Sequence, residues 1–201
     1  MRHALAGSII VILAAACGGS DGSSPEEAAS ELEELALRAD EAPEGLELDE
    51  DASGPRLLLR DVLPPQTDSP ELPTLPKTVR RAFAGGYDAR YVGSGQDGPT
   101  SLASSVLRFS DAVNATAFLE YLREVQSLTS TRSVGFSELV EAPGLGEEGY
   151  GWHRVAPGAE ISGCSWRRGD LVLTLTLGGP PGHAAAAAAI ELAGVVDARL
   201  A

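Results

Sequence analysis

The alternation of apolar and polar residues in the second half of the chain predicts a series of short β-strands. Short stretches rich in Val, Leu, Tyr and Trp are separated by segments rich in Gly, Pro, Ser and Asp, which is the usual pattern for strands joined by turns. Six strands are expected, at residues 87–92, 101–109, 136–141, 150–155, 161–166 and 171–177.

The last of these strands has two different faces. Four leucines share one face, and a valine and two threonines share the other: Leu171, Leu173, Leu175 and Leu177 against Val172, Thr174 and Thr176. Because side chains alternate across a strand, we expect the leucine face to turn inward and the hydroxyl-bearing face to turn outward.

Apolar residues at helical spacing predict two long helices. The first begins after Ser110 or Asp111, either of which can cap it, and runs to about Leu128. The second is rich in alanine and covers residues 183–200, after the break at residues 180–182. Strands with hairpin connections lie between the two helices. The pattern therefore predicts an α+β fold, a single small domain with an antiparallel sheet and two main helices packed on it.

The first 16 residues have the layout of a secretory signal peptide. A positive charge at Arg2 precedes an apolar stretch from Ala4 to Ala16, as export signals require. A membrane-spanning helix needs roughly 20 apolar residues, and this stretch is shorter. We therefore expect export and cleavage of residues 1–16.

The residues at the expected cleavage site resemble the bacterial lipobox, in which small residues precede a cysteine that is lipidated before cleavage. They read LAAAC at positions 13–17, with Ala14 where leucine is commonest. The resemblance implies a lipoprotein carrying a palmitate-type anchor on Cys17, held at the extracytoplasmic face of the cell membrane. Two acyl chains suffice for stable anchoring. The alternative is ordinary secretion after cleavage at Ala-x-Ala, with an incidental cysteine.

Charge separates a tether from a domain. The chain carries a net charge of −14. Residues 18–51 hold thirteen acidic side chains and one basic side chain, Arg38. We expect residues 17–54 to be the lipidated Cys17 followed by an acidic tether containing a short helix, and residues 55–201 to form the globular α+β domain. An acidic chain of this kind lacks the basic surface that nucleic acid requires.

The histidine and cysteine content gives little support for catalysis. Cys164 is the only cysteine left if Cys17 is lipidated, and a thiol in mid-strand is usually a small buried hydrophobe. No metal-ligand spacing or cofactor motif is present. We expect a non-catalytic binding or sensing module without a cofactor. The alternative is a cell-envelope enzyme, a hydrolase or a thiol enzyme, that uses Cys164 and His153.

One candidate ligand site combines indole rings and hydroxyl groups. Trp152 and Trp166 fall on expected strands near the outward threonines Thr174 and Thr176. Aromatic and hydroxyl side chains on a concave sheet face commonly bind small molecules. A small-molecule, lipid or glycan ligand is therefore expected here, and an envelope protein is the alternative partner of the domain. The competing interpretation is that the two indoles fill the core between the sheet and its helices.

The globular part also resembles small extracytoplasmic domains of high-GC, actinobacterial-type bacteria, which occur as lipoproteins and as sensor-like domains of membrane kinases. The resemblance spans about residues 101–200 and is carried by FSDA at 109–112, GLGEEGY at 144–150, WRRGDLVL at 166–173 and DARL at 197–200. It implies a binding or sensing class and supplies no catalytic residue.

Overall fold

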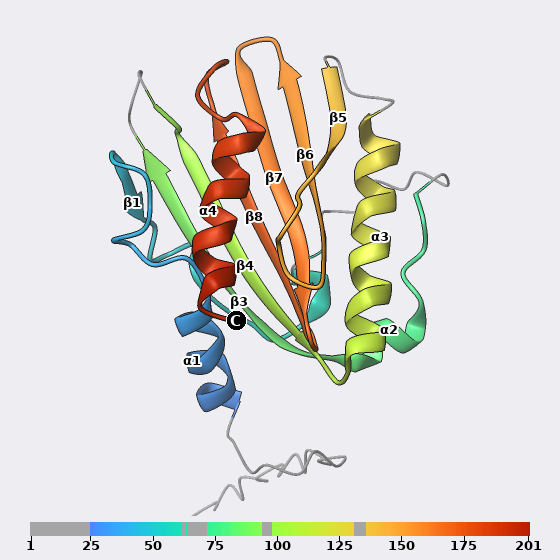
Figure 1. Ribbon diagram of the computed structural model, residues 1–201. Coiled ribbons are helices and arrows are strands. Elements are labelled where there is room, and N and C mark those ends of the chain that lie inside the picture. The colour runs from blue at the N-terminus through green and yellow to red at the C-terminus, as the bar shows by residue number, and fades with distance from the viewer. Residues whose placement is uncertain (1–24, 62, 64–71, 94–97, 131–135) are drawn as a thin grey trace, which may run out of the picture.

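The computed structural model describes residues 25–61, 63, 72–93, 98–130 and 136–201 (Figure 1). The expected signal peptide and Cys17 lie outside these residues. The described part contains four α-helices and one 3-10 turn: α1 (Pro25–Leu35), η1 (Leu59–Asp61), α2 (Lys77–Ala82), α3 (Ala112–Ser130) and α4 (Ala186–Ala198). None of these helices combines the length and the apolar character needed to cross a membrane.

The strands form one eight-stranded antiparallel sheet, which confirms the expected α+β class. Its order is β1-β3-β4-β8-β7-β6-β5, and β2 also pairs with β3. The strands are β1 (Leu46–Leu48), β2 (Gly54–Arg56), β3 (Phe83–Gly93), β4 (Ser101–Phe109), β5 (Phe136–Glu141), β6 (Glu148–Ala156), β7 (Ala159–Arg168) and β8 (Leu171–Gly179). All six expected strands are present, and β4 and β5 have the expected bounds.

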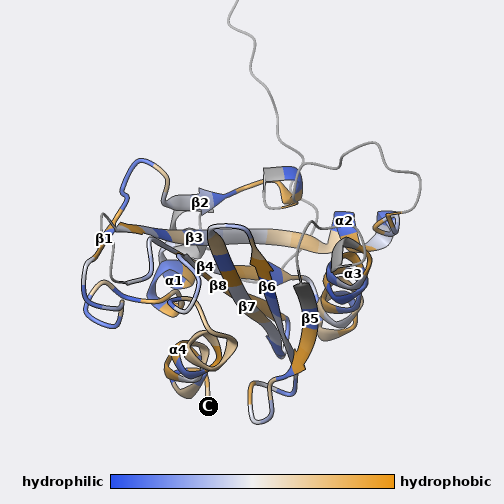
Figure 2. Cartoon of the chain, turned by 90° about the horizontal axis from the view of Figure 1, so that it is seen from above, coloured by the Kyte–Doolittle hydropathy of each residue, from blue (hydrophilic) through white to orange (hydrophobic). Residues whose placement is uncertain are grey.

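Helices cover both faces of the sheet (Figure 2). α1 and α4 pack on one face, and α2 and α3 pack on the other. The first face holds the leucines of β8 against Ala189, Ala193 and Val196 of α4. The second face holds Val172 against Ala115 and Phe118 of α3. The domain is therefore a sheet between two helical layers.

This arrangement corrects the expectation for β8. The leucine face is turned inward as expected, since Leu173 and Leu175 are at most 1% exposed. The opposite face is not open to solvent, because α3 lies over it: Val172 is fully buried and Thr174 and Thr176 are half-buried. β8 is a central strand with a layer on each side.

The acidic segment is also more ordered than expected from its charge. Leu32, Leu37 and Leu46 are buried in the core on the α4 face, and β1 and β2 pair with β3. Without them, β3 would present an unpaired edge. Widely spaced leucines thus attach the segment to the sheet, while acidic residues such as Glu31, Glu34 and Glu47 stay exposed. The described fold therefore begins at α1, upstream of residue 55.

Candidate functional site

The four residues of the expected ligand site do not lie together. In the β7–β8 ladder Trp166 pairs with Leu173, which places its indole on the α4 face. Trp152 pairs with Gly163, and Gly163 pairs with Thr176, so these residues face α3. Both indoles are core residues, 1% exposed for Trp166 and 7% for Trp152. Thr174 is the member of the set that borders a cavity.

A row of hydroxyl groups crosses the sheet beneath α3. Four residues on adjacent strands are directly opposite one another, from β4 through β8 and β7 to β6: Ser105, Thr174, Ser165 and Tyr150. Residues opposite one another in antiparallel strands point to the same face, with Cβ atoms about 5 Å apart. We call these four residues the hydroxyl row. Each of its three steps joins two hydroxyl-bearing side chains on a face that is otherwise largely apolar.

The rows on either side show how unusual this one is. On the same face, the flanking rows consist of small, apolar or charged residues, with Thr176 as the single hydroxyl: Leu107, Val172 and Arg167 on one side, and Ala103, Thr176, Gly163 and Trp152 on the other. The hydroxyl row is therefore a local feature of the α3 face.

A cavity of about 240 Å³ lies between the hydroxyl row and α3. All four residues of the row line it, and α3 contributes Phe118, Leu122, Val125 and Gln126, with Leu107 from β4. We call it the α3 cavity. Its volume is slightly below the ~300 Å³ at which typical ligand pockets begin. One wall carries hydroxyls and the other is mainly hydrocarbon.

Within the row, hydrogen bonding is incomplete. The hydroxyls of Ser165 and Thr174 are 3.1 Å apart and form a hydrogen bond. Tyr150 is 3% exposed, and among the described residues no group completes a hydrogen bond with its phenol oxygen. Burial raises the pKa of Tyr150 well above its ordinary value, and the nearby Ser165 hydroxyl offsets only part of the rise. Tyr150 is therefore a neutral hydroxyl at physiological pH, with its hydrogen available to an acceptor.

Tyr150 also borders a second cavity, of about 310 Å³, between α3 and β5. Arg123 and Glu141 line this second cavity. The Arg123 guanidinium lies over the Tyr150 ring, 5.8 Å from its centroid, a geometry that attracts a cation to an aromatic face. Tyr150 thus lies between the α3 cavity, whose described lining is uncharged, and a second cavity lined by one arginine and one glutamate.

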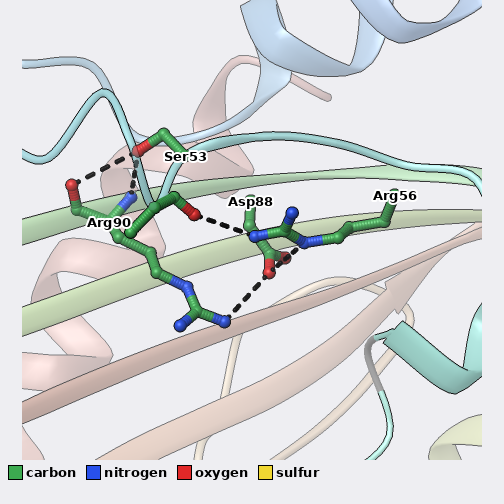
Figure 3. A network of polar contacts seen from close by, with 5 residues as sticks. Ser53, Arg56, Asp88 and Arg90 are labelled. Carbon is green, nitrogen blue, oxygen red and sulfur yellow. Dashed lines mark hydrogen bonds and ion pairs between the residues drawn. The ribbon is translucent and has the colours of Figure 1, made fainter.

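Carboxylates continue the hydroxyl row at both ends. Asp88 of β3 is opposite Ser105, and Glu141 of β5 is opposite Tyr150. Asp88 is 3% exposed and accepts hydrogen bonds from Arg56, at 2.9 Å, and Arg90, at 3.4 Å (Figure 3). Its charge is therefore balanced at the far edge of the row. Glu141 is exposed.

The geometry does not support the thiol alternative. Cys164 is fully buried on the α4 face, where its thiol donates to the Ala189 carbonyl oxygen at 3.6 Å. Burial raises the pKa of Cys164 to about 12, whereas a reactive thiol needs a lowered pKa. The His153 Nε2 atom is paired with Glu160, at 2.7 Å, rather than with Cys164.

The Glu160 carboxylate holds a loop in place. It is 6% exposed and accepts hydrogen bonds from the amides of Gly182 and Ala184, in the loop between β8 and α4. Burial by itself would raise the pKa of Glu160, but the bonds from His153 and these amides hold it below its ordinary value. Glu160, which is itself hydrogen-bonded to His153, therefore stabilises the loop that leads into α4. In the described ranges no three His, Cys, Asp or Glu side chains are grouped to hold a metal ion.

Two hairpin turns bring three residues of the hydroxyl row together. The residues Gly169-Asp170 and Pro157-Gly158 form two-residue turns, which fix the register of the strands that they join. Those registers place Ser165 beside Thr174 and Tyr150. The pairing of Ser105 with Thr174 joins segments separated by α3 and three strands, and no local pattern reveals it.

The fold defined above is an α+β domain whose antiparallel sheet has a helical layer on each face. No protein-family model matches the chain, and no curated protein matches its sequence. Among solved structures, the chain is similar to the extracellular domain of PknH from Mycobacterium tuberculosis, with a TM-score of 0.53 and 14% sequence identity. The similarity covers 90% of this chain and 98% of that one. At this identity the likeness establishes the fold alone.

Proposed function

We propose that the protein is a membrane-anchored, extracytoplasmic binding or sensing module that holds a small molecule in the α3 cavity. The observation that carries the proposal is the hydroxyl row, which ends on the buried, unpartnered phenol of Tyr150. Buried polar groups in folded proteins nearly always have a hydrogen-bond partner. A ligand in the α3 cavity would supply the hydrogen-bond partner that the Tyr150 phenol lacks.

The location and the class have separate support. The LAAAC segment resembles a lipobox with Cys17 as the lipidated residue, and the fold is shared with an extracellular domain. The burial of Cys164 and the pairing of His153 with Glu160 argue for binding rather than thiol chemistry. A lipid anchor at the N-terminus would leave the α3 cavity exposed to the envelope.

The binding proposal predicts that the protein keeps a bound small molecule during purification. We expect the chain purified from its own envelope to release a small molecule on denaturation, detected by mass spectrometry. Thr174→Val keeps the side-chain shape and removes one hydroxyl of the cavity wall, and should lower the retained amount about tenfold. Thr176→Val is the matched control, because Thr176 lies on the same strand and face but outside the cavity lining. Equal retention by both variants would place any ligand elsewhere.

The anchor is tested independently of the cavity. Cys17→Ser should move the protein from the membrane to the soluble exported fraction, because the replacement cannot accept the lipid. The fold should be unchanged, with the same circular dichroism spectrum. Continued membrane retention of the Cys17→Ser chain would refute the lipid anchor and leave the binding proposal standing.

A further inference from the structure

The lining of the α3 cavity limits the charge of any ligand. Its described residues are four hydroxyls, one amide and four hydrocarbon side chains: Ser105, Thr174, Ser165, Tyr150, Gln126, Leu107, Phe118, Leu122 and Val125. Charged side chains are absent from this set. A charge transferred from water into such a site loses its hydration and gains no opposite charge in return.

The charged groups around the cavity lie outside its lining. Both ends of the hydroxyl row are carboxylates, Asp88 and Glu141. Arg56 and Arg90 are already paired with Asp88. Arg123 lies over the Tyr150 ring and shares the second cavity with Glu141. None of these charged side chains lines the α3 cavity, so an anion there would meet hydroxyls and apolar groups with no counter-ion in the described cavity wall.

The hydrogen-bonding groups define what the polar part of the ligand must offer. The Tyr150 phenol has a hydrogen to donate and completes no hydrogen bond with the described residues, although the Ser165 hydroxyl lies near it. Ser165 and Thr174 use one bond on each other, and each keeps unused acceptor capacity. An oxygen acceptor placed against Tyr150 satisfies the phenol. The ligand body then lies against Phe118, Leu122 and Val125, which are apolar.

Resting on the proposed function, we propose that the ligand of the α3 cavity is an uncharged amphiphile, a short aliphatic body bearing a ketone, ester or hydroxyl oxygen. The oxygen accepts the hydrogen of Tyr150, and the aliphatic part packs on the apolar side of α3. The shape follows from the two unlike walls, and neutrality follows from the uncharged lining of the cavity.

A pair of probes that differ in charge tests the proposal. 2-Heptanone and heptanoate have matched chain lengths, and at pH 7 only the second is charged. Binding is measured by amide chemical-shift changes in the full chain carrying Cys17→Ser, so that no acyl anchor competes. We expect 2-heptanone to shift amides of β7, β8 and α3, and heptanoate to bind at least about tenfold more weakly. Thr174→Val should weaken 2-heptanone binding, and Thr176→Val should not.

A variant with an added cation tests whether charge, rather than size, decides which of the two probes binds. Gln126→Lys adds a cation to the cavity lining on α3 and should raise heptanoate affinity at least about threefold while leaving 2-heptanone affinity within about twofold. Heptanoate binding as tightly as 2-heptanone in the unaltered cavity would overturn the neutral class and leave the binding function intact. If neither probe shifts cavity amides in any variant, the inference and the proposed cavity both fail. Binding that persists equally in Thr174→Val likewise rejects the cavity.

Discussion

The two faces of the sheet are built from the same strands and differ in how their side chains pack against the helix that covers them. On the α4 face, leucines of β8 meet small residues of α4, and Leu175 and Ala189 are fully buried. On the α3 face, the same strands present the hydroxyl row, and a cavity remains above it. In a close-packed region, even the loss of one methylene group affects stability. The α3 face also has an apolar core, which includes Phe109, Phe118 and Trp152, and the α3 cavity lies beside it.

Each face also has its own polar contacts. On the α4 side Asp197 is 4% exposed and receives both a bidentate ion pair from Arg168, at 2.9 and 2.7 Å, and the Gly146 amide. These bonds join the C-terminal end of α4 to the β7–β8 turn and to the loop before β6. On the α3 side Tyr150 stays unpartnered. A buried side-chain atom without a hydrogen-bond partner occurs on each face, Trp166 Nε1 on the α4 face and the Tyr150 oxygen on the α3 face, and of these two residues it is Tyr150 that lines the α3 cavity.

The largest difference between the faces is expected from removing core volume. Leu175→Ala should lower the free energy of unfolding by about 2–5 kcal/mol, because a fully buried leucine leaves a cavity among close-packed neighbours. Ser165→Ala, one strand away on the α3 face, is the comparison and should cost only about 1 kcal/mol, the usual value of one hydrogen bond. Urea unfolding measures both. A loss for Leu175→Ala no larger than that for Ser165→Ala would mean that the α4 face is not closely packed around Leu175.

A smaller effect is expected at the α4 ion pair, and it depends on pH. The bonds from Arg168, together with the Gly146 amide, hold the pKa of Asp197 below its ordinary value despite burial. A carboxyl with a lowered folded pKa stabilises above its unfolded pKa, and that stability is lost as the pH falls through the folded value. Asp197→Asn should therefore cost about 1.5–3 kcal/mol at pH 7.

The pH profile distinguishes charge from shape at this position. Below about pH 4, where Asp197 begins to be protonated in the unfolded chain, the difference between the unaltered protein and Asp197→Asn should shrink. Urea unfolding at pH 7, 5 and 3 follows the trend. A difference that stays constant over this range would show that the carboxylate charge contributes nothing.

Most of the fold was predictable from the sequence, because its elements are local. The alternation of leucine and threonine in β8 and the capping position of Asp111 before α3 both identify elements without long-range information; the amide of Asn114 indeed donates to Asp111, at 2.8 Å. The burial of α1 was not predictable in the same way. Its apolar stripe is short and its acidic residues dominate the composition. The position of α1 depends on its tertiary contacts with β3, which no local pattern indicates.

The candidate site was predictable in part. Thr174 follows from the β8 pattern, and its pairing with Ser165 follows from the two-residue turn at Gly169-Asp170. The expected role of Trp166 required it to share a face with the threonines, and the register places it on the other face. The layer that closes the cavity is α3, whose docking face depends on tertiary packing rather than on a local pattern.

The smallest change in the chain tests the central claim most directly. Tyr150→Phe removes the unpartnered phenol oxygen and keeps the ring beneath Arg123. Leaving a buried polar group unpaired has a cost, so the variant without ligand should be as stable as the unaltered protein or more stable by up to about 1 kcal/mol. Its affinity for 2-heptanone should fall about tenfold, which corresponds to roughly 1.4 kcal/mol.

The two quantities are measured on one preparation, by urea unfolding and by amide chemical-shift titration with 2-heptanone. Gained or unchanged stability together with weakened binding is the result that this account predicts, because the phenol serves the ligand rather than the fold. A loss of stability greater than about 1 kcal/mol with unchanged affinity would contradict it, since Tyr150 would then be an ordinary structural residue of the α3 face.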